Sequence, residues 1–181
     1  MKSYDYACRV GVRRISWEDF ASLARNLAEL LEPHQPQVVL GIARAGLFPA
    51  TTVACSLRCE FFPIRLTRRL DDKVVYDRPV WKVAVPPDVE GKVVAVVDEI
   101  ADTGETLALA AAIATSSGAS KVITASLVSH SWANPAPQIT SLVSDELLIF
   151  PWDELVLQAG KWVVHPEIAA ALEAQSRSLK N

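Results

Sequence analysis

The residues best suited to chemistry stand where an apolar run ends. Residues 93–97 are all hydrophobic, Asp98 and Glu99 follow at once, and the stretch 102–106 reads Asp-Thr-Gly-Glu-Thr. A helix that begins after this stretch would present free backbone N–H groups, and these groups and the helix dipole favour an anion. The two threonine hydroxyls add hydrogen-bond donors, and the glycine lets the backbone approach a phosphate closely. The stretch 102–106 therefore predicts a phosphate site.

The acidic pair needs a different partner, because two carboxylates would repel a phosphate. An ionised carboxylate only accepts hydrogen bonds, so a sugar diol, which has two hydroxyl groups to donate, suits Asp98 and Glu99. A divalent cation suits them as well, and magnesium prefers oxygen ligands and phosphates. The pattern predicts a site for ribose 5-phosphate. The simpler alternative is a strand-to-helix turn in which Asp102 or Thr103 caps the helix, but capping leaves the acidic pair unexplained.

The rest of the sequence alternates between helical and extended segments. Apolar residues at helical spacing predict helices over 17–33, 45–57, 105–117 and 165–177, and continuous apolar runs predict strands over 37–43, 59–66, 92–99 and 121–128. Ser16 is expected to cap the first helix, with Asp19 in capping-box position. Strands that are apolar on both faces and separated by helices indicate an α/β fold with a central, mostly parallel sheet flanked by helices.

The expected sheet explains where the acidic pair lies, because ligands of open α/β sheets bind beyond the carboxyl ends of the strands. Three segments have no clear helical or strand period. Residues 67–83 are charged and aromatic, 131–138 read as a loop, and 146–156 predict only a short strand and a turn.

Length and composition set the outer limits. The chain of 181 residues suggests a single domain, 1–181, and half of the residues are hydrophobic. The net charge of −3 gives no indication of a nucleic-acid or membrane partner. The three cysteines are too few and too irregularly spaced for a zinc site or a disulfide framework. With no apolar run long enough for a signal peptide or a membrane span, we expect a soluble, cytoplasmic protein.

The segment VVAVVDEIADTGETL, residues 93–107, resembles the phosphoribosyl-pyrophosphate signature of type I phosphoribosyltransferases. That signature has hydrophobic residues, two acids, two variable residues and then Asp-Thr-Gly-x-Thr. Further segments resemble the xanthine-guanine and hypoxanthine-guanine branch of this family: SWEDFASLARNLAELL, VVLGIARAGLFPATTVA, ASLVSHSW and LLIFPWDEL.

The resemblance implies a fold and a reaction. The fold would be that of the type I phosphoribosyltransferases, with a small C-terminal hood on the base side at about residues 130–165. The reaction would be purine salvage: with Mg²⁺, a 6-oxopurine such as hypoxanthine, guanine or xanthine displaces pyrophosphate from phosphoribosyl pyrophosphate and gives a nucleoside monophosphate. The family also implies a homodimer or a higher homo-oligomer.

The resemblance also assigns roles to residues. Asp102 would be the general base for the purine proton, and Asp98 and Glu99 would hold the ribose hydroxyls, directly or through Mg²⁺. Residues 67–83 would form a mobile arm that excludes water, with Arg68, Arg69, Lys73, Arg78 and Lys82 as candidates to meet pyrophosphate. Phosphoribosyl pyrophosphate would be bound by Ala43, Arg44, Ala45, Gly46, Asp98, Glu99, Asp102, Thr103, Gly104, Glu105 and Thr106.

The chain departs from the family pattern most clearly in the base pocket, which would include His130, Leu147 and Leu148. His130 stands where the purine branch has a lysine that donates to the 6-oxo group, and Leu147 stands where small members have a stacking tryptophan. Trp132 or Phe150 could supply a ring instead, although a place in the core is the expected role for each. His130 could also be an exposed loop residue. Two functions follow: a purine phosphoribosyltransferase, or a non-catalytic protein of this fold that senses phosphoribosyl pyrophosphate or a nucleotide.

Overall fold

A computed structural model of the chain describes residues 11–67, 69–70, 73–76 and 80–178. Its contacts divide the chain into two compact units. The larger unit is Ser22–Ser144, and the smaller unit joins the residues up to Ala21 with those from Asp145 onward. The smaller unit differs from the hood expected at 130–165, because residues 130–144 belong with the larger unit.

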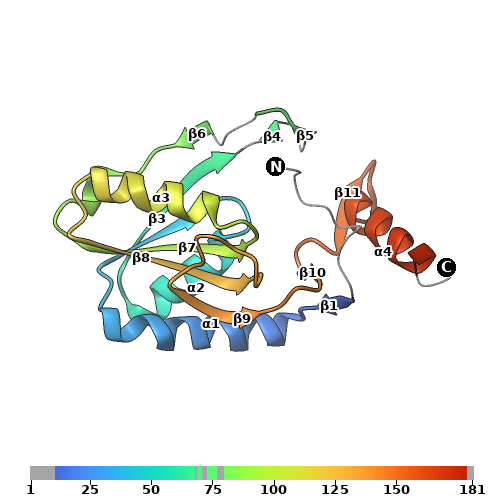
Figure 1. Ribbon diagram of the computed structural model, residues 1–181, viewed down its shortest axis with the longest axis horizontal. Coiled ribbons are helices and arrows are strands. Elements are labelled where there is room, and N and C mark those ends of the chain that lie inside the picture. The colour runs from blue at the N-terminus through green and yellow to red at the C-terminus, as the bar shows by residue number, and fades with distance from the viewer. Residues whose placement is uncertain (1–10, 68, 71–72, 77–79, 179–181) are drawn as a thin grey trace. The chain divides into compact units, whose positions relative to one another are not determined.

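A six-stranded sheet forms the centre of the larger unit, in the order β6-β3-β2-β7-β8-β9 (Figure 1). Neighbouring strands are parallel except at the β6 edge, where β6 pairs antiparallel with β3. The strands are β2 (Val38–Ile42), β3 (Glu60–Thr67), β6 (Val80–Val83), β7 (Val93–Ala101), β8 (Lys121–Ser129) and β9 (Ile139–Val143). The predicted α/β class and mostly parallel sheet are confirmed.

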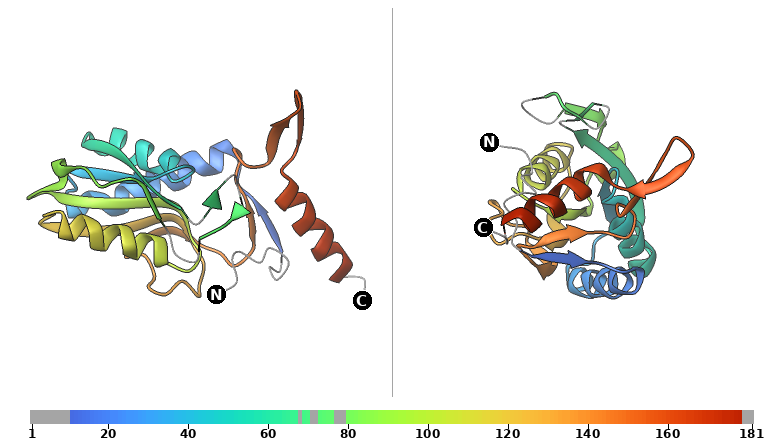
Figure 2. Two further views of the ribbon diagram at one scale, coloured as in Figure 1. Left: turned by 90° about the horizontal axis from the view of Figure 1, so that it is seen from above. Right: turned by 90° about the vertical axis from the view of Figure 1, so that its right-hand side faces the viewer.

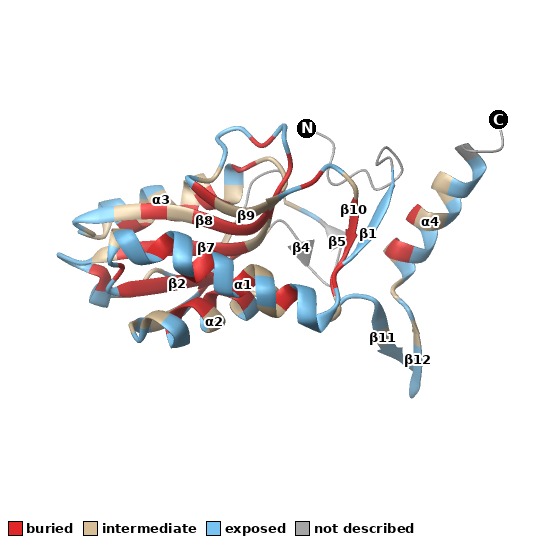
Figure 3. Ribbon diagram, turned by 90° about the horizontal axis from the view of Figure 1, so that it is seen from below, coloured by how far each residue is buried: buried red, intermediate tan, exposed pale blue. Residues whose placement is uncertain are grey.

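Helices cover both faces of this sheet (Figure 1). Helix α3 (Glu105–Ser116) packs on one face through Leu107, Ala110 and Ala114. The part of α1 (Trp17–Leu31) that belongs to this unit lies on the other face, together with α2 (Leu47–Leu57). All five residues of β2 are buried, which explains its continuous apolar sequence, and Figure 3 shows β2 and much of β7 as buried. Short 3-10 helices occur at Glu32–His34 and Pro87–Val89.

The N-terminus of α1 has the predicted capping box. The backbone N–H of Asp19 donates to Ser16 Oγ at 3.0 Å, and the N–H of Ser16 donates to the Asp19 carboxylate at 3.0 Å. The Ser16 hydroxyl also donates to the Asp19 carboxylate, at 2.8 Å. The two bonds that the carboxylate accepts, from the Ser16 N–H and the Ser16 hydroxyl, lower the pKa of Asp19 because they stabilise its ionised form. The reciprocal bonds fix the residue at which α1 begins.

The segment 67–83 contains more regular structure than its sequence indicates. Two short strands, β4 (Arg69–Leu70) and β5 (Lys73–Val74), pair antiparallel, and β6 forms the edge of the main sheet. Lys82 Nζ lies 5.6 Å from the centre of the Tyr76 ring. Arg68 and Arg78 fall outside the described residues, as do the side chains of Arg69 and Lys73, so the pyrophosphate contacts expected of the arm stay a prediction.

The smaller unit has its own core. Strand β1 (Val12–Arg14) lies parallel to β10 (Leu147–Ile149), as Figure 2 also shows. Strands β11 (Leu155–Gln158) and β12 (Lys161–Val164) form an antiparallel hairpin, and α4 (Pro166–Ser178) follows. Leu147 and Ile149 pack with Ile168 and Ala171 of α4. Among the described residues, no helix is both long and apolar enough to cross a membrane.

Candidate functional site

The predicted phosphate and sugar residues meet at one edge of the sheet. Strand β2 pairs with β7, and β7 pairs with β8, all in parallel, so the carboxyl ends of these strands are neighbours. The loop 43–46 follows β2, the loop 102–104 follows β7, and His130 follows β8. This edge is where α/β sheets bind their ligands, and the topology therefore brings together segments far apart in the sequence.

The loop after β2 lies directly against the acidic end of β7. A Cβ atom built on Gly46 would stand 2.5 Å from the carbonyl oxygen of Ile42 and 2.6 Å from Oδ1 of Asp98. The φ of Gly46 is −60°, which any residue adopts, so close approach is the reason for glycine here. The peptide bond between Ala43 and Arg44 is cis. Arg44 is exposed and Ala43 and Ala45 are half-buried.

The acidic pair lies within β7, because the strand continues to Ala101 instead of ending at Glu99 as its sequence indicated. Asp98 is only 8% exposed and accepts a hydrogen bond at 2.9 Å from the backbone N–H of Glu99. Burial raises the pKa of Asp98 well above its ordinary value, and the negative charge of Glu99 raises it further. A cation at this pair would relieve both effects, since it would compensate the buried charge and the repulsion.

The loop after β7 is shaped by Gly104. Its φ is +83°, and a Cβ atom built on it would stand 1.9 Å from the carbonyl oxygen of Pro135. Gly104 is the N-cap residue of α3, so neither Asp102 nor Thr103 occupies that position, but Thr103 Oγ1 accepts a hydrogen bond at 3.4 Å from the backbone N–H of Glu105, the first residue of the helix. The backbone N–H of Asn134 donates to the Thr103 carbonyl at 2.9 Å, which holds the 131–138 loop against this turn. Thr103 and Thr106 are half-buried, and Glu105 is exposed.

Asp102, the predicted general base, has an aromatic neighbour that sequence analysis did not assign to it. The indole N–H of Trp132 donates to Asp102 Oδ1 at 3.2 Å. Trp132 is 45% exposed, so the expectation that it belongs to the core is wrong. Its place six residues before Gln138, in a loop without period, gave no signal of this contact, because the pairing depends on how β7 and β8 align.

His130 is buried at 2% exposure, so the alternative of an exposed loop histidine is wrong. Its Nδ1 lies 2.6 Å from the carbonyl oxygen of Ser144. A carbonyl only accepts, so Nδ1 carries the proton, and Nε2 of the neutral ring is an acceptor. Nε2 is 4.0 Å from Asp102 Oδ1. Donation from Nε2 to a 6-oxo group would therefore require the imidazolium form. Base binding by His130 stays a prediction.

Leu147 and Leu148, the other predicted base contacts, are buried in β10 of the smaller unit. Leu147 packs within the core of that unit, and contact of either leucine with a base stays a prediction.

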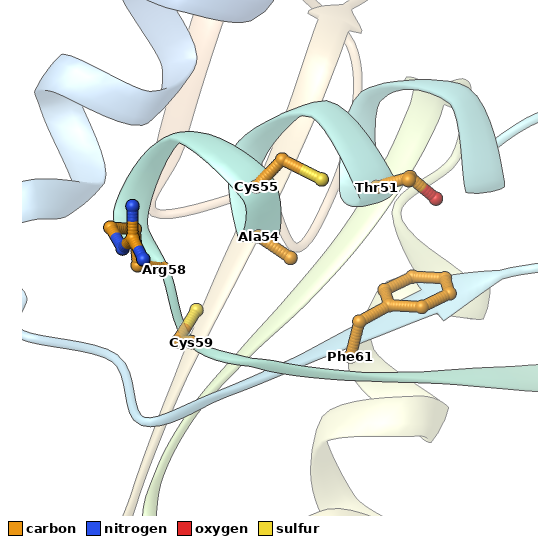
Figure 4. Close-up of a pocket in the computed structure, with 6 residues that line it drawn as sticks. All are labelled: Thr51, Ala54, Cys55, Arg58, Cys59 and Phe61. Atoms are coloured by element: carbon orange, nitrogen blue, oxygen red, sulfur yellow. The ribbon is translucent and has the colours of Figure 1, made fainter.

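A separate hollow of about 510 Å³ lies along α2 and the start of β3 (Figure 4). It is lined by Thr51, Ala54, Cys55, Arg58, Cys59 and Phe61, none of which is a predicted site residue. Burial raises the pKa of the Cys59 thiol.

Comparison with known proteins gives the same family as the signature. Residues 16–158 match the model of the phosphoribosyl transferase domain. The chain is 25% identical over 124 residues to an adenine phosphoribosyltransferase of Rhodospirillum centenum, an alignment that covers 65% of this chain and 72% of that protein.

Solved structures are similar over most of the chain. A purine phosphoribosyltransferase from Pyrococcus horikoshii has a TM-score of 0.72 and 26% identity, and the match covers 81% of this chain and 97% of that one. The Helicobacter pylori xanthine-guanine-hypoxanthine phosphoribosyltransferase has a TM-score of 0.66 over 90% of this chain and 99% of its own. At 16% identity, this second likeness shows the fold alone.

Gly104→Ala should damage the site far more than the same change at Gly91. Both glycines have positive φ, at +83° and +68°, so both substitutions cost about 1–2 kcal/mol of backbone strain. Only at Gly104 does the new methyl group also meet another atom, the Pro135 carbonyl, whereas Gly91 has nothing within 4 Å. Urea denaturation should show a clearly larger loss of unfolding free energy for Gly104→Ala. Equal losses would mean that Pro135 does not press on this turn.

Proposed function

Because this chain belongs to the phosphoribosyl transferase domain family and is a phosphoribosyltransferase, we propose that it transfers the 5-phosphoribosyl group of phosphoribosyl pyrophosphate to a purine base. The observation that carries the proposal is the meeting of the loops after β2 and β7, with Gly46 in contact range of Asp98. One loop would bind pyrophosphate, and the other would bind the 5-phosphate. The carboxylates between the two loops would meet the sugar, because the ribose lies between the 5-phosphate and the pyrophosphate of phosphoribosyl pyrophosphate.

Each half of the site supports its assigned ligand. Residues 43–46 offer backbone N–H groups and the exposed guanidinium of Arg44 to pyrophosphate. Residues 103–106 stand at the N-terminus of α3, where backbone N–H groups favour the 5-phosphate.

Magnesium fits this arrangement. Asp98 and Glu99 supply hard oxygen ligands. Burial and the negative charge of Glu99 raise the pKa of Asp98, and a cation would offset both causes. Among the described residues, no group of three or more histidine, cysteine, aspartate or glutamate side chains could hold a metal ion. Asp98 and Glu99 would therefore share the ion with oxygen atoms of phosphoribosyl pyrophosphate. When bound, the ion neutralises the charge of the leaving pyrophosphate.

Asp102 would handle the proton of the reaction. The bond between C1 of the ribose and the pyrophosphate oxygen breaks, a bond forms between C1 and a ring nitrogen of the purine, and the proton on that nitrogen passes to the Asp102 carboxylate. Asp102 suits this role because it is half-buried at the strand end, with its Oδ1 held by the indole of Trp132. Water must be kept out, because it would otherwise attack C1.

We propose a 6-oxopurine as the acceptor, as the resemblance to the xanthine-guanine and hypoxanthine-guanine branch implies. A second candidate is adenine, and the contacts of His130 favour it. With Nδ1 committed to the Ser144 carbonyl, the neutral ring offers no donor from Nε2 to a 6-oxo group. The relative from Rhodospirillum centenum is an adenine phosphoribosyltransferase.

Removing both charges of the acidic pair should weaken substrate binding. Asp98→Asn with Glu99→Gln keeps the size of each side chain and removes the attraction for Mg²⁺, so calorimetric titration of phosphoribosyl pyrophosphate with magnesium should show at least a tenfold loss of affinity, roughly the loss of one charge-assisted hydrogen bond. Asp88→Asn with Glu90→Gln is the matched control, because both carboxylates are exposed and precede β7, away from the end of the strand that carries Asp98. Unchanged affinity in the double variant would place the ligand elsewhere.

Asp102→Asn should cut turnover by roughly 10²- to 10⁴-fold, the usual contribution of a positioned acid–base group. The amide keeps the shape of the carboxylate but cannot take the proton. The affinity for phosphoribosyl pyrophosphate should change little, because the backbone groups of the loop remain. Pyrophosphate release should be followed with the purine that the parent uses best, and equal turnover in variant and parent would remove Asp102 from the chemistry.

A further inference from the structure

Two rings of the segment after β8 meet the same oxygen of Asp102. The indole N–H of Trp132 donates to Oδ1 at 3.2 Å, and Nε2 of His130 lies 4.0 Å from Oδ1. The two rings are stacked on each other, with centres 4.4 Å apart and planes 19° from parallel. One face of the imidazole is therefore covered by the indole. Nε2 of the imidazole and the indole N–H both face the Asp102 carboxylate, which the proposed function names as the base.

The orientation of His130 is fixed from its other side. Its Nδ1–H donates to the Ser144 carbonyl at 2.6 Å, and the N–H of Ser144 donates to the Ser129 carbonyl at 3.1 Å. The N–H of His130 itself donates to the Ala101 carbonyl at 3.1 Å. Backbone groups of β7, β8 and the end of the β9 segment thus hold the ring, and the tautomer with the proton on Nδ1 leaves a lone pair on Nε2.

This lone pair faces the Asp102 carboxylate. His130 and Asp102 can therefore share one proton between Nε2 and Oδ1. The distance of 4.0 Å is longer than a hydrogen bond, but catalytic hydrogen bonds often tighten only when the substrate is bound. At 2% exposure, His130 has little water to stabilise a positive charge, so its protonated form depends on the negative charge of Asp102. The groups that face the ring include Asp102 at Nε2, the Ser144 carbonyl at Nδ1 and Trp132 on one face.

We propose that His130 acts through Asp102 as a positioning residue and as the store for the proton that leaves the purine. The proton passes from the ring nitrogen of the base to the Asp102 carboxylate and is then shared with Nε2 of His130, which becomes an imidazolium. The Nδ1–H bond to Ser144 is unchanged, and the proton leaves to water after the product departs. Trp132 holds Oδ1 in line through its N–H. This role rests on the proposed function.

The chemical advantage lies in matching proton affinity to the working pH. An isolated carboxylate titrates at about 4, far from neutrality, whereas an imidazole titrates at about 6.5. General bases work best when they titrate near the operating pH. Coupling Asp102 to His130 gives the carboxylate access to an acceptor in that range. A residue that only packed the loop would not need a ring nitrogen aimed at Asp102.

His130→Asn tests this role directly. The asparagine amide can still donate to the Ser144 carbonyl from a position close to that of Nδ1, but it has no group in place of Nε2. We expect turnover to fall roughly 10- to 100-fold, within the lower range for a group that assists proton transfer. The acidic limb of the pH profile of kcat/KM for the purine should move to lower pH, because the imidazole that takes up the proton in the parent is gone. The KM for phosphoribosyl pyrophosphate should stay within about twofold of the parent value. A profile that superimposes on that of the parent would overturn the proposal.

Trp132→Phe is the matched comparison, because it keeps a stacked ring and loses only the N–H. It should lower turnover several-fold through a less well-held Asp102 and leave the acidic limb where it is in the parent. A shift of the limb as large as that of His130→Asn would contradict the division of roles between the two rings.

Nitrogen-15 NMR of the intact protein keeps the proposal open to test if His130→Asn fails to fold. The chain has only three histidines, so the His130 signals can be assigned with single variants of His34 and His165. We expect the proton of neutral His130 on Nδ1, and a lower titration midpoint for His130 in Asp102→Asn than in the parent. If the His130 midpoint is the same in Asp102→Asn and in the parent, and the parent is active, this proposal alone is overturned. If the parent releases no pyrophosphate with any purine, the proposed function is overturned, and the role of His130 with it.

Discussion

Parallel pairing of β2 with β7 is the interaction on which the candidate site depends. The register that sets Gly41 beside Val97 brings the loop after β2 against the acidic pair of β7, and Gly46 makes that approach possible because any side chain there would overlap Asp98. If β2 and β7 were not neighbours, the loop suited to pyrophosphate and the loop suited to a sugar phosphate would be separate anion sites. Because the strands are neighbours, the two loops form two ends of one site, with carboxylates between them.

The same edge of the sheet concentrates unfavourable features that only a ligand would relieve. Asp98 is buried beside a second carboxylate, and burial and repulsion both raise its pKa. The pKa of Asp98 is higher in the folded state than in the unfolded state. The folded state therefore loses stability as the pH rises from the unfolded-state pKa through the folded-state pKa, and a bound cation would restore that stability. Gly104 holds a left-handed turn under the Pro135 carbonyl. Such costs are typical of functional sites, where the fold stabilises an arrangement that its local sequence does not favour.

Most of the sheet could be predicted from the sequence, and so could the sugar-phosphate part of the site, Asp98, Glu99 and residues 102–106. Continuous apolar strands and the acidic and threonine residues of this stretch are local signals. The capping box of Ser16 and Asp19 is such a signal, and so is the strand before Asp98. Strand β9 gives no such signal, because its residues after Ile139 are partly buried or exposed and its sequence ITSLV has no regular alternation. The contact of Trp132 with Asp102 and the orientation of His130 could not be predicted, because both depend on how β7, β8 and the segment after β9 align in space.

The carboxyl edge of the sheet is proposed to carry out phosphoribosyl transfer to a purine. Pyrophosphate release from phosphoribosyl pyrophosphate should be measured with magnesium and adenine, hypoxanthine, guanine or xanthine in turn, with a reaction that lacks any base as the background. The account predicts release well above background with at least one of the four purines, together with formation of the matching nucleoside monophosphate. Release that stays at background with all four, by protein that binds phosphoribosyl pyrophosphate, would contradict it and would favour a protein that senses this ligand without turnover.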